Sequence, residues 1–269
     1  MIVLILALIV LLLQLYLLAL MGRQQHPGWK ELEGVRYAHR GLHGNGVAEN
    51  SMTAFRLAVE KGYGMELDVH LLADGTLAVI HDGTLLRTTG CEGKVEDLTR
   101  ADLEKYALEG TADTIPAFSQ VLELVNGAVP LIVELKSADN NYAALTDAAC
   151  ALLKNYHGAY CIESFDPRCI YHLRKHHPEV IRGQLARNFF KSDVKISWYQ
   201  KLCMTTQLAN FLTQPDFVAY RFAERKRLGV FLVQKFWKLH TVGWTIRTPE
   251  DLEKAEKENW LPIFEGFTP

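Results

Sequence analysis

The chain has 269 residues, of which 49% are hydrophobic and 22% are charged, a composition that excludes a disordered or fibrous protein. Its 29 lysine and arginine residues against 31 aspartate and glutamate residues give a formal charge of −2, whereas nucleic-acid-binding proteins are usually basic. No nucleic-acid partner is therefore expected. The five cysteines are odd in number and form no Cys-x-x-Cys pair, so neither a disulfide scaffold nor a zinc ribbon is expected.

Residues 1–22 are predicted to be a transmembrane anchor. Residues 2–21 form an apolar run interrupted only by Gln14 and Tyr16, and twenty helical residues span about 30 Å, the thickness of the hydrocarbon core. A cleaved signal peptide is the alternative. The run lacks a basic start, exceeds the usual length of a signal's apolar region and ends without a small-residue cleavage pattern. The sequence therefore favours a single-pass membrane protein that keeps this helix.

The side of the membrane on which the globular domain lies is predicted from only a few charges. No lysine or arginine precedes the apolar run, whereas Arg23, Lys30 and Arg36 follow it, so the positive-inside rule favours a cytoplasmic globular domain. Unpaired cysteines point the same way. The opposite orientation stays open, because the predicted orientation depends on only three basic residues. We expect residues 23–33 to be a linker and residues 34–269 to be the globular domain.

Short β-branched runs alternate with helical patterns after the linker, which is typical of a mostly parallel sheet. Strands are expected at 34–38, 65–70, 76–81, 129–136, 160–164, 180–185, 217–220, 241–246 and 262–267. Helices are expected at 51–61, 99–108, 117–125, 142–156, 167–176 and 249–258. A hairpin signal at Ala73-Asp74-Gly75 makes one of the nine strands an accessory strand. Eight remaining units predict a TIM-type (β/α)8 barrel.

Charge is unevenly distributed along the globular part. Residues 31–134 contain 8 basic and 17 acidic side chains, and residues 135–247 contain 17 and 8. An ordinary solvated surface accounts for this distribution. The alternative hypothesis is a basic rim that faces anionic lipid headgroups beside the anchor. Its members would be Arg174, Lys175, Arg182, Arg187, Lys191, Lys195, Arg225, Lys226 and Arg227.

Three carboxylates and a lysine stand in predicted strands. Glu66 and Asp68 are two residues apart, so their side chains share one face, and Glu134 and Lys136 repeat this spacing in another apolar strand. An unpaired carboxylate in such a strand costs on the order of several kcal/mol. Oxygen-only ligands suit Ca²⁺ or Mg²⁺. The alternative is an internal salt bridge between Glu134 and Lys136, with Glu66 and Asp68 at the solvent rim.

Two histidines directly follow strand-like runs. His39 begins the segment His39-Arg40-Gly41 after the first strand, and His81 begins His81-Asp82. The carboxyl ends of barrel strands share one face, so both histidines could act there as general acid and general base. Arg40 offers a planar donor fork suited to phosphate. Trp244 ends an apolar strand, where it either packs in the core or forms a wall of the substrate pocket.

Together these segments resemble the glycerophosphodiester phosphodiesterase family. The matching segments, in family order, include Ala38-His39-Arg40-Gly41, Glu49-Asn50-Ser51, Glu66-Leu67-Asp68-Val69, His81-Asp82, Glu134-Leu135-Lys136, Ser164-Phe165-Asp166-Pro167 and Trp244-Thr245-Ile246. Each is weak alone, but their order and spacing are specific. The resemblance implies a TIM-type barrel, one divalent cation, and hydrolysis of a glycerophosphodiester to sn-glycerol 3-phosphate and an alcohol.

The resemblance also implies roles for individual residues. Glu66, Asp68 and Glu134 correspond to the family's metal ligands, His39 and His81 to its acid/base pair, and Arg40 and Lys136 to its phosphate-contacting cations. The nucleophile is either water or the neighbouring glycerol hydroxyl, which would first give a cyclic phosphate.

The sequence departs from the family pattern at Ala48, Ser51, Arg247 and the segment 264–267. These departures leave the substrate open, and a lysophospholipid would be compatible with the anchor. Two other functions stay open as well. One is a phospholipase-type lipid phosphodiesterase that releases a cyclic phosphate, and the other is a non-catalytic membrane-tethered barrel that binds headgroups.

Overall fold

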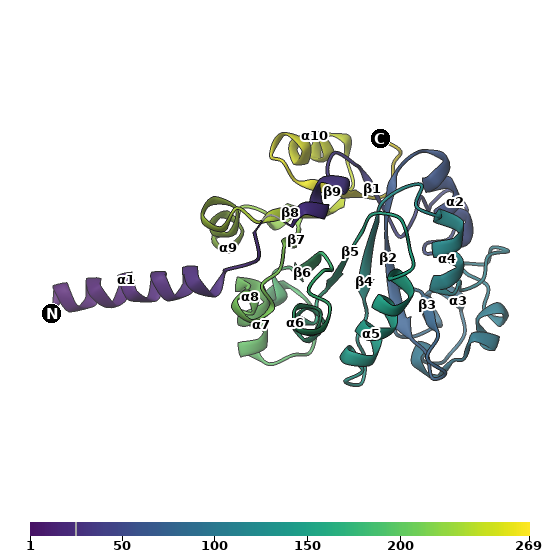
Figure 1. Ribbon diagram of the computed structural model, residues 1–269, viewed down its shortest axis with the longest axis horizontal. Coiled ribbons are helices and arrows are strands. Elements are labelled where there is room, and N and C mark those ends of the chain that lie inside the picture. Colours follow the sequence, from purple (N-terminus) through teal and green to yellow (C-terminus); the bar gives the residue numbers. More distant parts are fainter. Residues whose placement is uncertain (25) are drawn as a thin grey trace.

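Eight parallel strands close into a barrel in the computed structural model, which describes residues 1–24 and 26–269 (Figure 1). The barrel strands are β1 (Tyr37–His39), β2 (Gly64–Leu71), β4 (Leu131–Leu135), β5 (Tyr160–Ser164), β6 (Arg182–Ala186), β7 (Phe217–Arg221), β8 (His240–Ile246) and β9 (Leu261–Phe264). Closure follows because β1 pairs with both β2 and β9. β3 (Leu77–Val79) pairs antiparallel with β2. The predicted TIM-type barrel with an accessory hairpin strand is confirmed.

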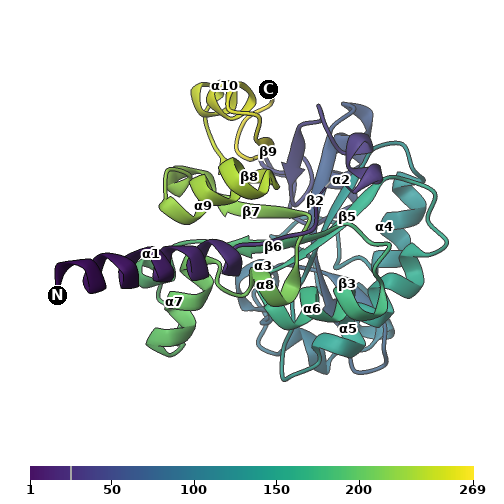
Figure 2. The same cartoon turned by 60° about the vertical axis from the view of Figure 1, so that its left-hand side comes forward.

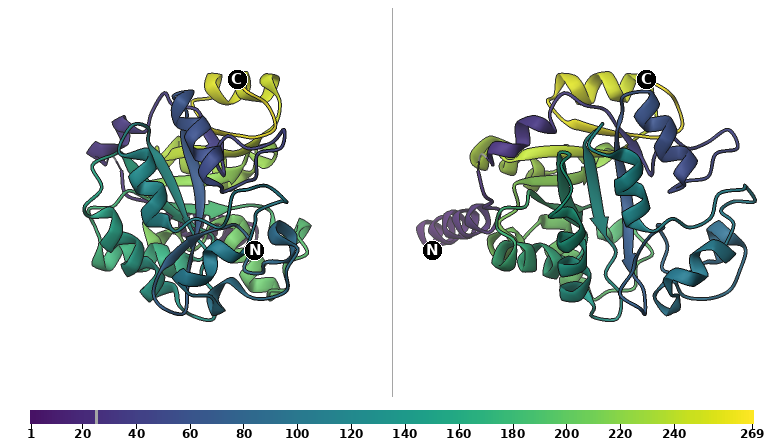
Figure 3. Two further views of the ribbon diagram at one scale, coloured as in Figure 1. Left: turned by 90° about the vertical axis from the view of Figure 1, so that its right-hand side faces the viewer. Right: turned by 45° about the vertical axis from the view of Figure 1, so that its right-hand side comes forward.

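Helices connect the strands and cover the outside of the barrel (Figure 3). They are α2 (Met52–Glu60), α3 (Leu86–Thr89), α4 (Phe118–Val125), α5 (Tyr142–Leu153), α6 (Pro167–His176), α7 (Trp198–Thr206), α8 (Asn210–Thr213), α9 (Leu228–Leu232), which continues into a π-helical turn (Val233–Trp237), and α10 (Pro249–Lys257). The segment predicted as a helix at 99–108 forms a shorter 3-10 helix, Arg100–Lys105. α3, α7, α8 and α9 were not predicted.

Side-chain caps fix where several of these helices begin. The Ser51 hydroxyl accepts a hydrogen bond from the Ala54 amide, and α6 begins at Pro167 with the Asp166 carboxylate accepting from the Arg168 amide. Thr248 caps α10 in the same way. Such side chains replace backbone partners that the first helical turn lacks. They therefore fix where α2, α6 and α10 begin after strands β1, β5 and β8.

Apolar side chains fill the barrel, among them Tyr37, Ile132, Phe217 and Val242, all of which are buried. Phe217 lies so close to Gly183 on the neighbouring strand that a Cβ at Gly183 would stand 2.1 Å from its ring. Only glycine leaves room for this side chain. The interior of the barrel is thus a packed core. A functional site is therefore expected at the carboxyl ends of the strands.

Within the predicted linker, whose residue 25 lies outside the described residues, residues 26–33 pack against the amino-terminal end of the barrel. Trp29 and Leu32 are buried there. Arg23 forms a two-point ion pair with the buried carboxylate of Asp216, with Nε–Oδ1 and Nη2–Oδ2 distances of 2.5 and 2.6 Å. The division into residues 1–22, 23–33 and 34–269 stays a prediction, but the middle segment is held by specific contacts.

The N-terminal helix α1 (Ile2–Ala19) projects away from the barrel (Figures 1 and 2). It is the one helix among the described residues that is long and apolar enough to cross a membrane, and none of it is buried. A signal sequence near the N-terminus would have the same properties. Anchoring and orientation therefore stay predictions.

Candidate active site

The candidate acidic residues lie side by side on the adjacent strands β2 and β4, level with the carboxyl ends of β1 and β4. In the parallel register Asp68 of β2 is opposite Glu134 of β4, and Glu134 is opposite Glu163 of β5. Glu66 precedes Asp68 by two residues on β2, so the two share one face. The barrel topology thus gathers residues far apart in the sequence into one cluster.

Glu66, Asp68 and Glu134 are buried, and one carboxylate oxygen from each lies within 4.8 Å of the others. The Lys136 ammonium lies 2.9 Å from Asp68 Oδ1 and 2.6 Å from Glu134 Oε1. The predicted Glu134–Lys136 salt bridge is therefore present. The alternative that placed Glu66 and Asp68 at the solvent rim is wrong, since they are only 2% and 0% exposed.

Burial and mutual repulsion perturb these carboxylates. Burial raises the pKa of Glu66 well above its ordinary value, and the nearby charges of Asp68 and Glu134 raise it further. Burial also raises the pKa of Glu134, to about 7, although Lys136 opposes the shift. The pKa of Asp68 is lowered, because Lys136, His81 and Arg40 outweigh the effect of its burial. The cluster therefore favours additional positive charge.

This donor set fits a divalent cation. Three converging carboxylates supply only oxygen ligands, the type that Ca²⁺ and Mg²⁺ prefer, and the raised pKa values of Glu66 and Glu134 are what a bound cation would relieve. Glu163 adds a fourth buried carboxylate beside Glu134, and its Oε2 has no hydrogen-bond partner among the described residues.

Each candidate histidine is oriented by a carboxylate. His39 Nδ1 lies 3.2 Å from Glu265 Oε2, and His81 Nδ1 lies 2.6 Å from Asp82 Oδ1. An ionised carboxylate can only accept, so Nδ1 carries the hydrogen in both rings and the Nε2 lone pair stays available. Nε2 of His39 lies 3.8 Å from Glu66 Oε2, next to the acidic cluster.

Both histidines favour the neutral form. Burial lowers the pKa of His39, and burial lowers that of His81 to about 4 despite the opposing charge of Asp68. The hydrogen bond from His39 lowers the pKa of Glu265 to about 2. Near pH 7 the free protein thus presents two neutral imidazoles and an ionised Glu265, which suits proton transfer.

Arg40 is held between the acidic cluster and Glu49. Its backbone amide donates to Glu66 Oε2 at 3.1 Å, and its Nη1 donates to Glu49 Oε1 at 2.8 Å. Its Nε is buried without a hydrogen-bond partner among the described residues, although it lies 3.5 Å from Asp68 Oδ2. Asn50 donates to the same Asp68 oxygen at 2.8 Å. Glu49 therefore holds the Arg40 guanidinium in place.

A cavity of about 910 Å³ opens beside the cluster, with His81, Glu134 and Lys136 in its lining. Phe165 also lines it and stands between the cavity and Trp244, whose ring packs edge-on at 5.6 Å. The indole Nε1 of Trp244 is buried without a hydrogen-bond partner in the part of the chain that the structure describes. Trp244 therefore supports the cavity wall through Phe165.

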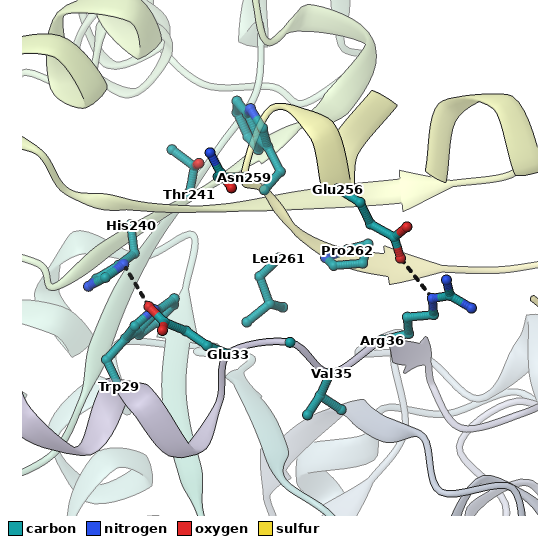
Figure 4. Close-up of a pocket in the computed structure, with 12 residues that line it drawn as sticks. Trp29, Glu33, Val35, Arg36, His240, Thr241, Glu256, Asn259, Leu261 and Pro262 are labelled. Carbon is teal, nitrogen blue, oxygen red and sulfur yellow. Dashed lines mark hydrogen bonds and ion pairs between the residues drawn. The ribbon is translucent and has the colours of Figure 1, made fainter. Parts of the chain in front are cut away.

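A second cavity, of about 540 Å³, lies at the opposite end of the barrel, where β8 and β9 begin (Figure 4). Arg36 pairs there with Glu256 at 2.8 Å, and His240 Nδ1 lies 3.7 Å from Glu33 Oε1. None of the candidate acidic residues or histidines lines it. The carboxyl-end cavity is therefore the candidate active site.

Comparison with known proteins identifies the family. The model of the glycerophosphoryl diester phosphodiesterase family matches residues 39–264. The chain belongs to this family. It is accordingly a phosphoric diester hydrolase, and the resemblance seen in the motifs is confirmed. The family match covers all of the candidate acidic residues and both histidines.

Relatives of this phosphodiesterase agree with the assignment. A glycerophosphodiester phosphodiesterase of Caldanaerobacter subterraneus subsp. tengcongensis is 30% identical over 233 residues, 82% of this chain and 88% of the relative. One of Bacillus altitudinis is 42% identical over 120 residues, 41% of this chain and about half (49%) of the relative. An Oleispira antarctica phosphodiesterase solved with sn-glycerol-3-phosphate superposes with a TM-score of 0.72 at 20% identity, covering 90% of this chain and 95% of the other.

Sequence reasoning missed two residues at the site of this phosphodiesterase. Glu163 had a usable signal, because it is a carboxylate in the otherwise apolar strand β5, like Glu134 in β4. Glu265 had none, since it meets His39 from 226 residues away. Arg247 donates to Glu265 at 2.7 Å, so two departures from the family pattern contact each other.

Proposed function

We propose that this phosphodiesterase hydrolyses glycerophosphodiesters to sn-glycerol 3-phosphate and an alcohol, with one divalent cation, Ca²⁺ or Mg²⁺. Glu66, Asp68 and Glu134 would hold the cation. The supporting observation is the buried three-carboxylate cluster beside two histidines that are each oriented by a carboxylate. When bound, the cation would stabilise negative charge on the phosphate.

Arg40 and Lys136 are the proposed phosphate-binding cations. Both are side chains beside the acidic cluster, and the Nε of Arg40 lacks a hydrogen-bond partner among the described residues. A phosphodiester gains negative charge as the nucleophile adds, so preorganised positive charges favour the transition state over the substrate. Trp244 is proposed to shape the substrate pocket by supporting Phe165.

His39 and His81 are the proposed acid and base. An anionic phosphodiester beside a neutral imidazole raises its pKa, so one histidine can carry a proton in the complex although both favour the neutral form before binding. One ring then accepts the proton of the nucleophile, and the other protonates the departing alkoxide. The nucleophile is water or the neighbouring glycerol hydroxyl, and the latter would give a cyclic phosphate first.

We also propose that α1 is an uncleaved anchor with the barrel on the cytoplasmic side, as Arg23, Lys30 and Arg36 after the helix favour. The protein should then stay in the membrane fraction after alkaline extraction. Protease added to sealed inverted vesicles should digest the barrel. Release into the soluble fraction with loss of the N-terminal residues would identify α1 as a signal sequence.

The activity is tested with the full chain in detergent micelles. Products of soluble glycerophosphodiesters with different alcohols are followed by phosphorus NMR, which separates glycerol 3-phosphate from a cyclic phosphate, with Ca²⁺, Mg²⁺ or EDTA. We expect metal-dependent release that falls about 10²–10⁴-fold in His39→Ala and stays unchanged in the matched control His157→Ala, whose side chain is exposed. Turnover near wild type in His39→Ala would remove its acid/base role.

A further inference from the structure

Exposed apolar side chains are concentrated in one part of the barrel domain. Among the described residues after α1, thirteen large hydrophobic side chains are exposed, and ten of them lie between Phe190 and Phe236. Eight belong to three helices and the π-helical turn after α9, and we name these eight the α7–α9 surface. They are Trp198, Tyr199, Leu202, Phe211, Leu212, Leu228, Phe231 and Phe236. Trp198 is 71% exposed, which is unusual for a large aromatic side chain in a folded domain.

The α7–α9 surface lies next to the apolar N-terminal helix. The Tyr16 hydroxyl of α1 donates to the backbone carbonyl of Thr206 at the end of α7, at 3.1 Å. Trp237, which ends the π-helical turn after α9, donates its indole N–H to the carbonyl of Leu17 at 2.7 Å. Figures 1 and 2 show α7, α8 and α9 grouped around the base of α1. The surface is therefore continuous with the end of the proposed anchor.

Basic side chains accompany these apolar groups. Residues 187–238 contain ten lysine and arginine residues but only three acidic residues. One of the three, Asp216, is buried in its ion pair with Arg23, and another, Glu224, accepts a hydrogen bond from the Asn188 amide. An apolar and basic surface with tryptophan and tyrosine suits the headgroup region of an anionic bilayer.

We propose that the α7–α9 surface lies in the headgroup region of the leaflet beside α1. The helix and the surface would then contact one membrane together. Part of the predicted basic rim supports this contact, since Lys191, Lys195 and Lys226 are exposed. Arg182 does not belong to the rim, because it is buried at the start of β6 and donates to the carbonyl of Thr213.

α7 connects this surface with the active site. Gln200, Cys203 and Met204 on one side of the helix line the carboxyl-end cavity, whereas Trp198 and Leu202 on the other side are exposed. A docked α7 would therefore place one wall of the cavity at the bilayer. This step rests on the proposed function, and it names a substrate class: a glycerophosphodiester that carries an acyl chain and resides in the membrane, such as a lysophospholipid.

Docking is tested without reference to catalysis. The full chain is reconstituted into phosphatidylcholine vesicles with and without phosphatidylglycerol, with bromine on the acyl chains near the headgroup. We expect tryptophan quenching that is stronger with phosphatidylglycerol and falls in Trp198→Phe, because Trp198 is exposed, whereas Trp29 and Trp260 are buried and Trp237 and Trp244 are partly buried. Equal quenching of wild type and Trp198→Phe would overturn the proposal. Cross-linked dimers in which Trp198 is shielded from bromine would instead assign the surface to protein contact.

Substrate class is tested with Leu228→Glu/Phe231→Glu on α9, which lies away from the cavity lining. Leu152→Glu/Tyr171→Glu is the matched control, because these residues are also exposed and apolar but lie on α5 and α6. We expect the turnover rate of the α9 variant on vesicle-borne lysophospholipid to fall about tenfold, whereas its rate on a soluble diester should stay unchanged. Equal effects of both variants would overturn the substrate class. Failure of the wild type on both substrates would count against the proposed function instead, while the quenching result would stand.

Discussion

Glu265 contacts His39 from the last barrel strand, and Glu265→Gln tests whether this contact orients the histidine. Glu265 Oε2 accepts from His39 Nδ1 at 3.2 Å and from Arg247 Nη2 at 2.7 Å. Glutamine keeps the size and one acceptor oxygen but removes the charge, and its amide end can also present a donor to the ring. The variant therefore weakens the preference for the tautomer with hydrogen on Nδ1.

The size of the effect follows from the titration of Glu265. The hydrogen bond from His39, with nearby cationic groups, lowers its pKa from 4.5 to about 2, which corresponds to roughly 3 kcal/mol in favour of the charged form. The side chain is 22% exposed, so solvent screening reduces this to about 1–2 kcal/mol. We therefore expect kcat/KM to fall roughly 5- to 30-fold.

The pH dependence gives a second, independent readout. Burial lowers the pKa of His39, and the hydrogen bond to Glu265 opposes this shift. Removing the charge of Glu265 should therefore lower the pKa of His39 further. The part of the pH profile of kcat/KM that reports the titration of His39 should then move to lower pH. Initial rates on a soluble glycerophosphodiester would be measured across pH for wild type, Glu265→Gln and Arg247→Gln. The last separates the two contacts of Glu265, because Arg247 pairs with Glu265 and makes no hydrogen bond to His39. A Glu265→Gln rate within about twofold of wild type, with an unshifted profile, would refute the orienting role.

Three further predictions concern the metal, a histidine and the N-terminal segment. Glu66→Gln should raise the metal concentration for half-maximal activity by about tenfold or more, and an unchanged requirement would remove it from the ligand set. If His81 is the general base, only its neutral form accepts the proton of the nucleophile, so with a pKa of about 4 the acid limb of kcat/KM should lie near pH 4, whereas a limb near 6.5 would contradict the burial effect. Arg23→Ala leaves Asp216 buried without its cation, at a cost of about 3 kcal/mol, so Tm should fall by about 6–12 °C. The exposed-pair control Arg36→Ala should change Tm by less than about 2 °C, and equal shifts would contradict the argument.

Much of the barrel could be predicted because its information is local. The alternation of β-branched runs with helical patterns indicates a parallel sheet, and the turn at 73–75 identifies the accessory strand. Residues at strand ends were also predictable, because the barrel brings all carboxyl ends to one face. Glu66, Asp68 and Glu134 were therefore expected to lie close together, as the structure shows. Their roles stay predictions.

Other features depend on contacts that a local pattern does not contain. The position of Glu265 beside His39 requires that the last strand close against the first. The short helices between β6 and β8 were missed because their apolar residues are exposed, as Trp198 and Phe231 show, so the usual core-facing periodicity is absent. The linker prediction failed to anticipate contacts for a similar reason, since Arg23 meets Asp216 across 193 residues.

The tight connection between α1 and the barrel determines how such an enzyme would search for substrate. Contacts from Tyr16, Leu17 and Arg23 fasten the base of α1 directly to the barrel domain. With α1 in a bilayer, the active-site opening would keep a constant height and tilt above the lipid surface. The enzyme would then meet its substrates by lateral diffusion in two dimensions. Its turnover would follow the surface density of the substrate in that membrane rather than its bulk concentration.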